Sequence, residues 1–189
     1  MDQPPMTRPQ PTSEALLRDY FHGKDENRPL YIARAFAPDA RLRMILKTQA
    51  IAFPSEVEGA PGIADTLVRK FGQTYENVYT FYLARPTAGA RLDQFACDWM
   101  VAMTDKTSGQ VRVGCGSYDW HFQADPHLVR ELAITIDAME VLPAETAGAV
   151  FDWITALPYP WTDRAAISAG APALAALRPV LAYLNRADA

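Results

Sequence analysis

Three segments of the sequence, LDQFACDWMVAMT (92–104), QVRVGCGSYDWHF (110–122) and LVRELAITIDAMEV (128–141), decide the fold. They are rich in β-branched and aromatic residues, and each is well over the usual strand length of about five to six residues. The connections between them carry turn signals, since the first ends in Gly109 and the second contains an Asp-Pro pair. The pattern predicts three long antiparallel strands that form one wall of a container.

The side chains also predict how these strands pair. A turn after residue 105 places Trp99 opposite Gly116 and Cys97 opposite Tyr118, and a turn after Phe122 places Tyr118 opposite Leu132 and Asp119 opposite Glu131. In this register the apolar side chains gather on one face, and burial of that face selects against a slip. The buried face is expected to consist of Phe95, Cys97, Trp99, Val101, Met103, Tyr118, Trp120, Phe122, Leu132, Ile134 and Ile136. The outer face is expected to hold Gln94, Asp98, Ser117, Asp119, His121, Glu131, Thr135 and Asp137.

Composition narrows the possible function classes. The 189 residues fit one domain, and 49% hydrophobic with 21% charged residues is ordinary for a globular protein. A net charge of −4 argues against a nucleic-acid partner or an anionic membrane surface. No apolar run approaches the roughly 20 residues of a membrane helix, and the N-terminus lacks the pattern of a secretory signal. We therefore expect a cytoplasmic protein.

The sequence shows no metal-ligand spacing, so we expect neither a metal nor another cofactor. The three histidines, His22, His121 and His127, form no zinc-type motif. The two cysteines, Cys97 and Cys115, fall on opposite faces of the predicted wall and should not form a disulfide.

The remaining segments predict helices and shorter strands around this wall. Residues 1–12 hold four prolines and predict a flexible arm. Ser13 is the expected N-cap of the first helix, whose stripe contains Tyr20. The expected elements are helices at 13–23 and 27–37, strands at 40–46 and 56–58, a helix at 62–71, a strand at 75–84, and helices at 143–157 and 171–185, the last kinked at Pro179.

Two short motifs accompany this order of elements: FAPDA (36–40), a helix-to-strand step, and GSYDWHF (116–122). The second is similar to a Gly-x-Tyr-x-x-x-Phe strand. Together they resemble the nuclear transport factor 2-like superfamily, which includes ketosteroid isomerase, scytalone dehydratase and the SnoaL-like polyketide cyclases. The resemblance covers residues 13–142. It implies an α+β fold, in which a cone-shaped, strongly curved antiparallel sheet wraps around the N-terminal helices, with 143–189 as a C-terminal helical extension of the same domain.

The resemblance implies an apolar pocket between the concave face of the sheet and the first helices. It does not carry a catalytic base across, because the stretch that corresponds to the isomerase's Asp is LKTQ (46–49), which has no carboxylate. Catalytic residues therefore stay unknown. The residues that we expect to bind a ligand are Tyr20, Trp99, Tyr118, Trp120 and Ile134.

Each candidate has an alternative role. Tyr118 is expected to be the main hydrogen-bonding group of the pocket, or else to fill the core with its hydroxyl bonded to a neighbour. Trp99 and Trp120 can line a pocket or pack on the helices. Asp98, Asp119 and His121 resemble a catalytic trio when read linearly, but the predicted pairing places them on the outer face.

Two functional hypotheses follow. The first is a small-molecule-binding protein with an apolar pocket for an aromatic or polyketide-like compound, with lyase, isomerase or cyclase as the candidate reaction. Gly114 and Gly116 would leave space for the ligand opposite Trp99. The second is a non-enzymatic dimeric interaction module whose cavity is filled. A homodimer is expected in both, through outer-face side chains that include Met100, Val111, Val113, Ala133 and Met139.

Overall fold

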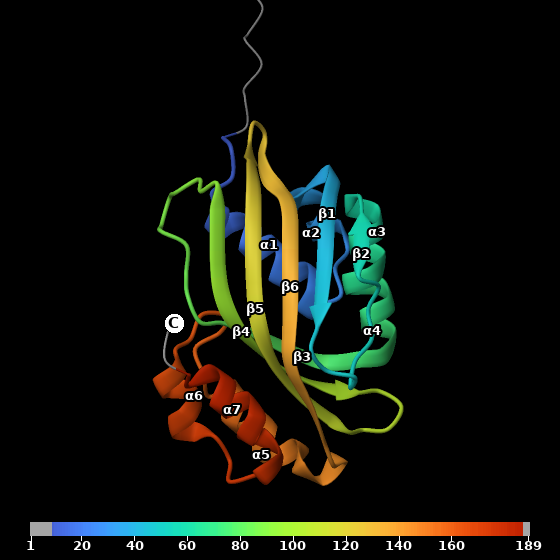
Figure 1. The fold of residues 1–189 in the computed structure, drawn as a ribbon, viewed down its shortest axis with the longest axis vertical. Coiled ribbons are helices and arrows are strands. Elements are labelled where there is room, and N and C mark those ends of the chain that lie inside the picture. The colour runs from blue at the N-terminus through green and yellow to red at the C-terminus, as the bar shows by residue number, and fades with distance from the viewer. Residues whose placement is uncertain (1–8, 187–189) are drawn as a thin grey trace, which may run out of the picture.

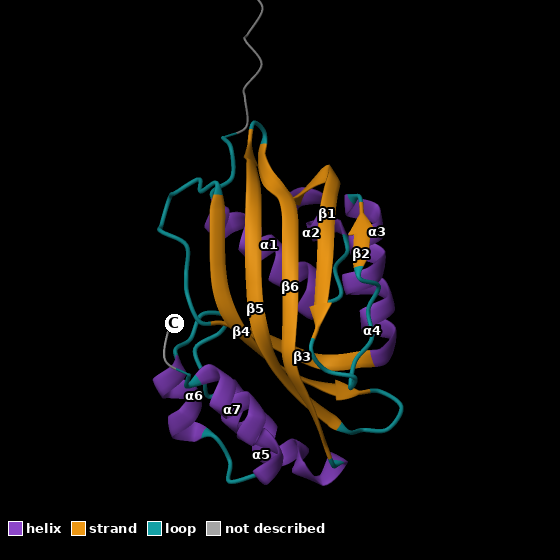
Figure 2. Ribbon diagram, in the orientation of Figure 1, coloured by secondary structure: helices purple, strands orange, loops and turns teal. Residues whose placement is uncertain are grey.

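A computed structural model describes residues 9–186 as a curled six-stranded sheet with helices on both faces (Figures 1 and 2). The strands follow the spatial order β2-β1-β6-β5-β4-β3. The edge strands β2 and β3 do not pair with each other, so the sheet is not closed as a barrel. The strands are β1 (Phe36–Leu46), β2 (Glu56–Glu58), β3 (Tyr75–Tyr82), β4 (Gln94–Asp105), β5 (Val111–Ala124) and β6 (His127–Leu142).

The sheet is mixed, whereas the sequence predicted an antiparallel one. β3, β4, β5 and β6 form an antiparallel meander, but the last of them returns beside β1 in the same direction as that strand. This α+β architecture is otherwise as predicted. The helices are α1 (Ser13–Asp25), α2 (Leu30–Ala35), α3 (Ala60–Ala64), a π-helical segment (Asp65–Lys70), α4 (Phe71–Thr74), α5 (Ala147–Thr155), α6 (Arg164–Gly170) and α7 (Arg178–Leu184), with short 3-10 turns at Ala144–Thr146 and Ala175–Leu177.

The C-terminal helices differ from the predicted ones in two respects. The helix α6 was not predicted; it begins after the N-cap Asp163, whose side chain accepts from the amide of Ala166 at 2.8 Å. Pro179 does not kink a long helix, because it lies in the first turn of α7, where its missing N–H costs nothing.

The predicted pairing of β4 and β5 is confirmed along its whole length. Trp99 lies opposite Gly116, and Cys97 lies opposite Tyr118. The predicted pairing of β5 and β6 was wrong by two residues, because Tyr118 lies opposite Ile134 rather than Leu132. One residue of the shift arises at the turn, where Phe122 lies opposite Val129 rather than Leu128, and the bulge between His121 and Phe122 adds the second. A further bulge between Cys115 and Gly116 moves the rest of the pairing by one more residue.

A shift of two residues keeps the side chains between the two bulges on their predicted faces, so the division into inner and outer faces is retained there. Asp119 lies opposite Ala133, and it is His121 that lies opposite Glu131, so the expected like-charge pair does not form. Asp137 is the extra residue of a bulge, and beyond it the odd-numbered rather than the even-numbered residues of β6 point inward. Met139 therefore lies in the concave core. Its predicted place on the outer face was wrong for this reason.

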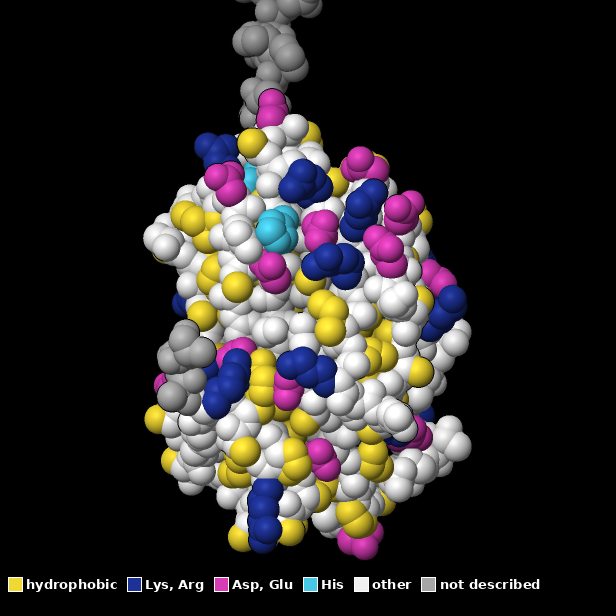
Figure 3. All heavy atoms as spheres, viewed as in Figure 1, with side chains coloured by type: hydrophobic (Ala, Val, Ile, Leu, Met, Phe, Trp, Pro, Cys, Tyr) yellow, Lys and Arg dark blue, Asp and Glu magenta, His cyan; other side chains and the backbone are white. Residues whose placement is uncertain are grey.

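The C-terminal segment covers part of the outer face of the sheet. α5, α6 and α7 pack there around Met100, Val111 and Val113, three of the side chains on which the expected dimer interface rested. Cys115 belongs to this outer core and Cys97 to the concave core, and both are free thiols. The outer face above these helices carries positive and negative side chains side by side (Figure 3).

Homodimerisation stays a prediction. Light scattering at roughly 50 µM tests it, and we expect the mass of two chains.

The start of α1 is held by contacts that differ from the predicted ones. Thr12 is the N-cap, and its hydroxyl accepts from the amide of Ala15 at 3.2 Å. Ser13 is instead fully buried, where its hydroxyl accepts from the amide of Leu92 at 2.8 Å and lies 3.1 Å from Nε2 of His127. Gln10, within the predicted flexible arm, accepts from the amide of His127 at 2.7 Å. The rest of that arm, residues 1–8, lies outside the described residues.

The environment of His127 predicts a pH-dependent stability. Its Nδ1 lies 3.1 Å from the carbonyl oxygen of Gln123, which can only accept, so Nδ1 carries the proton and Nε2 accepts from Ser13. Burial lowers the pKa of His127 below its usual value. The unfolded chain therefore takes up the proton first, and stability present above about pH 6.5 is lost as the pH falls toward the folded-state pKa.

We expect the free energy of unfolding to fall between pH 7.5 and 5.5 with a slope of at most about 1.4 kcal/mol per pH unit from this group. Urea unfolding at several pH values measures it. His127→Gln should flatten the profile, while His121→Gln, on the outer face, should leave it as in the wild type. Equal slopes in all three proteins would exclude His127 as the cause.

Candidate binding site

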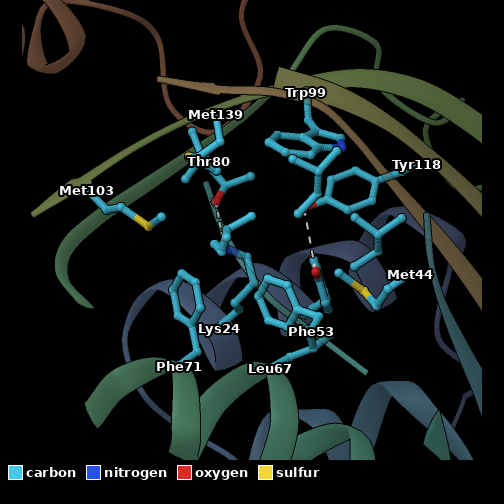
Figure 4. Close-up of a pocket in the computed structure, with 15 residues that line it drawn as sticks. Lys24, Met44, Phe53, Leu67, Phe71, Thr80, Trp99, Met103, Tyr118 and Met139 are labelled. Atoms are coloured by element: carbon cyan, nitrogen blue, oxygen red, sulfur yellow. Dashed lines mark hydrogen bonds between the residues drawn. The ribbon is translucent and has the colours of Figure 1, made fainter. Parts of the chain in front are cut away.

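A small cavity of about 40 Å³ lies between the concave face of the sheet, α1 and the helical segment 60–74 (Figure 4). Most of its wall is apolar, with methionines from β1, β4 and β6 among the lining side chains. The polar side chains in the lining are Tyr20, Lys24, Thr80, Trp99 and Tyr118. A mostly apolar cavity with a few converging polar groups is the usual form of a small-molecule site.

Four of the five residues predicted to bind a ligand meet at this cavity. Tyr20 reaches it from α1, Trp99 from β4, Tyr118 from β5 and Ile134 from β6. Trp120 is not among the lining residues. It is fully buried and packs edge-on against Tyr20, with 4.8 Å between the ring centroids, so the structure gives it the core-packing role.

Tyr20 and Tyr118 bring two phenol groups together at one end of the cavity. Their hydroxyl oxygens lie 3.5 Å apart, with Tyr20 as the donor, and the dashed line in Figure 4 marks this contact. Burial raises the pKa of both hydroxyls, so both stay protonated at neutral pH. The indole Nε1 of Trp99, whose side chain is also buried, has no hydrogen-bond partner among the described residues. This end of the cavity therefore offers hydrogen-bond donors.

Lys24 supplies the other polar end, and the sequence analysis missed it. Its Nζ donates to Oγ1 of Thr80 at 2.8 Å, lies 2.9 Å from Oδ1 of Asp25 and is 5.0 Å from the centre of the Phe71 ring. The residue is only 9% exposed. The spacing in the sequence could have indicated that Lys24 is buried, because it follows Tyr20 by four residues and so lies on the buried face of α1.

Asp25 is held behind Lys24 by three donors. Its carboxylate accepts from the backbone amide of Thr80 at 2.7 Å, from the Thr80 hydroxyl at 2.9 Å and from the Tyr159 hydroxyl at 2.8 Å. The Asp25 side chain is 1% exposed. Tyr159 belongs to the C-terminal segment, so the extension reaches the group that balances the charge of Lys24.

The three polar residues that resembled a catalytic trio have other roles. Asp98 lies on the outer face, where it accepts from Arg164 at 2.7 Å, from Tyr183 at 3.1 Å and from Arg186 at 2.9 Å. These contacts tie the C-terminal segment to β4. Asp119 and His121 lie on the same outer face, as the predicted strand register required, and their side chains are 3.2 Å apart.

Within residues 9–186 no three or more His, Cys, Asp or Glu side chains lie together in a way that could hold a metal ion. In the same range no helix has the length and apolar character needed to cross a membrane. The predicted cytoplasmic location stays a prediction.

Solved structures with the same arrangement identify the fold. An NTF2-like protein from Burkholderia thailandensis superposes with a TM-score of 0.53 at 15% identity, over 67% of this chain and 92% of that one. A protein with a ketosteroid isomerase-like fold from Catenulispora acidiphila, in complex with trimethylamine, superposes with a TM-score of 0.51 at 14% identity, over 66% of this chain and 85% of that one. LinA superposes with a TM-score of 0.51 at 12% identity, over 67% of this chain and 84% of that one. The chain has the nuclear transport factor 2-like fold. Neither a protein-family model nor a curated protein matches its sequence.

The glycines of β5 serve the NTF2-like sheet in a way that differs from the prediction. A Cβ on Gly116 would overlap the backbone carbonyl of Thr135 and lie 2.9 Å from Cζ2 of Trp99. A Cβ on Gly114 would lie 2.5 Å from the terminal methyl of Met139. The expected open space opposite Trp99 is therefore filled, and Gly116 is required by the close approach of β6 at the bulge.

One wall of this cavity is thin. Ile51 and Phe53, from the loop between β1 and β2, line the cavity on one side and an outer groove of about 340 Å³ on the other, together with Phe71. The rings of Phe53 and Phe71 stack with centroids 6.4 Å apart. Arg112 donates to the carbonyl of Ala50 and holds this loop against the sheet. Ile51, Phe53 and Phe71 therefore form the wall between the cavity and the groove.

Proposed function

We propose that this NTF2-like protein binds a small, largely apolar molecule in its concave cavity. The observation that carries the proposal is Lys24, a buried ammonium group placed in a mostly apolar wall. Burying such a group costs free energy unless it has partners, and it gives the cavity a strong donor for a ligand. Tyr118 and Trp99 add donors from the opposite side. A protein of similar fold is known in complex with the small molecule trimethylamine.

The reaction class that we propose for this site is isomerase, lyase or cyclase chemistry on an aromatic or polyketide-like compound. None of the described residues that line the cavity is a carboxylate or a histidine. Proton transfer at a bound ligand would then have to use Lys24 or the Tyr20–Tyr118 pair. This restricts the chemistry to steps that an amine or a phenol can assist.

The ligand would enter past Ile51 and Phe53 from the outer groove. The cavity of about 40 Å³ has room for few atoms. Met44, Met103 and Met139 line it, and methionine side chains adapt their shape at small cost. Opening of the thin wall and rearrangement of these methionines would give space for an aromatic ring.

The small volume also supports the second hypothesis, a dimeric interaction module whose cavity is filled by its own side chains. The aromatic contacts of Tyr118 with Tyr20, Tyr82 and Trp99 are consistent with such a core. Ligand binding distinguishes the two, because a module of this kind would bind no small molecule inside the sheet.

We expect aromatic and polyketide-like compounds to raise the melting temperature of the wild-type protein, and Val101→Phe to abolish this effect. Val101 lines the cavity, so a phenyl ring there occupies the ligand's space. Val113→Phe is the matched control, since Val113 is buried on the opposite face of the neighbouring strand. Each variant should lose about 1–3 kcal/mol of stability from overpacking. Ligands that stabilise both variants equally would place the site elsewhere.

Tyr118→Phe should weaken ligand binding by about 0.5–1.5 kcal/mol, the net value of one neutral hydrogen bond. Isothermal titration with the best compound from the melting experiment measures this. Tyr183→Phe is the control, because that hydroxyl bonds to Asp98 on the outer face. Unchanged affinity in Tyr118→Phe would remove Tyr118 from the contacts of the ligand.

A further inference from the structure

The cavity carries one ammonium group and yet has little net charge at its wall. Lys24 is the only charged side chain among the described lining residues, and the Asp25 carboxylate lies 2.9 Å from its Nζ. Both side chains are almost fully buried. At this separation and burial the two charges largely cancel at the position of a ligand.

This balance determines which ligands the cavity accepts. A carboxylate ligand would have to lose its hydration, and its attraction to Lys24 would be opposed by repulsion from Asp25. An uncharged ligand with a carbonyl or another acceptor loses far less hydration, and it can still accept a charge-assisted hydrogen bond from Lys24. Selection between the two classes therefore depends on the carboxylate behind the lysine.

We propose that Asp25 is a specificity-determining residue, which makes the cavity select uncharged acceptor ligands over anions. This proposal rests on the proposed binding function. Tyr159 is a positioning residue for it, since its hydroxyl holds the Asp25 carboxylate at 2.8 Å. The C-terminal segment, to which Tyr159 belongs, thereby takes part in ligand selection.

The first test uses the wild-type protein and matched ligands of similar shape at neutral pH. Acetophenone, benzoate and cumene form one set, and 2-acetylnaphthalene, 2-naphthoate and 2-isopropylnaphthalene form a larger one. Titration calorimetry should show the ketone binding at least about tenfold more tightly than the carboxylate in the set that fits. A carboxylate that binds as tightly as its ketone would overturn the proposal and leave the binding function intact. Binding of no compound in either set would overturn both.

The second test changes the balance of charge. Asp25→Asn leaves Lys24 without its counter-ion, and the ratio of ketone to carboxylate affinity should shift toward the carboxylate by about tenfold or more. Tyr159→Phe keeps the ion pair but loosens it, and should shift the ratio in the same direction by about threefold. This second variant keeps the test open if Asp25→Asn does not fold.

Two controls separate selection from general damage. Lys24→Met combined with Asp25→Asn removes both charges, and should bind the hydrocarbon without any gain for the carboxylate. Asp152→Asn, at an exposed position of α5, should keep the wild-type ratio. A purely structural role of Asp25 would lower the affinity for ketone and carboxylate equally, and an unchanged ratio in Asp25→Asn and Tyr159→Phe would overturn the proposal.

Discussion

Gly116→Ala is expected to lower the free energy of unfolding by about 3 kcal/mol or more, although it adds a single methyl group. The new Cβ would overlap the carbonyl oxygen of Thr135, a backbone atom that cannot move without breaking the pairing of β5 and β6. Overpacking usually costs about 1–3 kcal/mol, and a backbone collision lies at the upper end. Urea unfolding followed by circular dichroism measures the loss.

Gly148→Ala is the matched control for this substitution. Gly148 lies in α5, and an added Cβ would have no atom within 4 Å apart from the adjoining backbone of its own helix. There the same methyl group should stabilise the protein by about 0.5–1 kcal/mol, because alanine favours the helix. Equal effects at the two sites would show that the bulge relaxes easily and that Gly116 is not required for it.

Val180→Asp is expected to cost at least about 3 kcal/mol and to release the C-terminal helices from the sheet. Val180 is fully buried in α7, within the apolar layer that also contains Val113 and Met100. A carboxylate there would be an unpaired buried charge, which is among the most destabilising changes in a protein interior. Hydrogen exchange of the α5–α7 amides should rise with the loss of stability.

Ala182→Asp provides the control on the same helix. Ala182 is exposed, so the same charge stays in water and should change the free energy of unfolding by no more than about 0.5 kcal/mol. If Val180→Asp were equally mild, the C-terminal segment would be a loose appendage of the sheet. The covered outer face would then be open to other partners.

The fold could be predicted to a large extent because local patterns and burial agree. The alternation in β4 and β5, together with the turn that ends in Gly109, determined their register, because a slip of one residue would mix apolar Trp99 and Tyr118 with polar Asp98 and Ser117. The register of β6 could not be predicted, because bulges insert residues without any strong local signal. α6 was missed for a related reason, since seven residues give too short a period to recognise.

The candidate site was predicted in its aromatic part and missed in its charged part. Tyr20, Trp99, Tyr118 and Ile134 follow from a strand or helix period that turns them inward. Lys24 follows the same period, but a lysine near the end of a helix is usually solvated, and its partner Thr80 is 56 residues away. The contact between Tyr159 and Asp25 spans 134 residues.

The sequence by itself determined the inner and outer faces of the long strands, because alternation is local and burial of apolar surface acts on it directly. It also determined the order of most of the elements. The tertiary structure alone decided that β1 lies parallel to β6, that α5–α7 cover the outer face, and that Gly116 meets the carbonyl of Thr135. It alone placed a buried carboxylate behind Lys24. These features depend on contacts between groups that are remote in the chain. Packing and desolvation energies are determined by distances in space, which sequence spacing does not give.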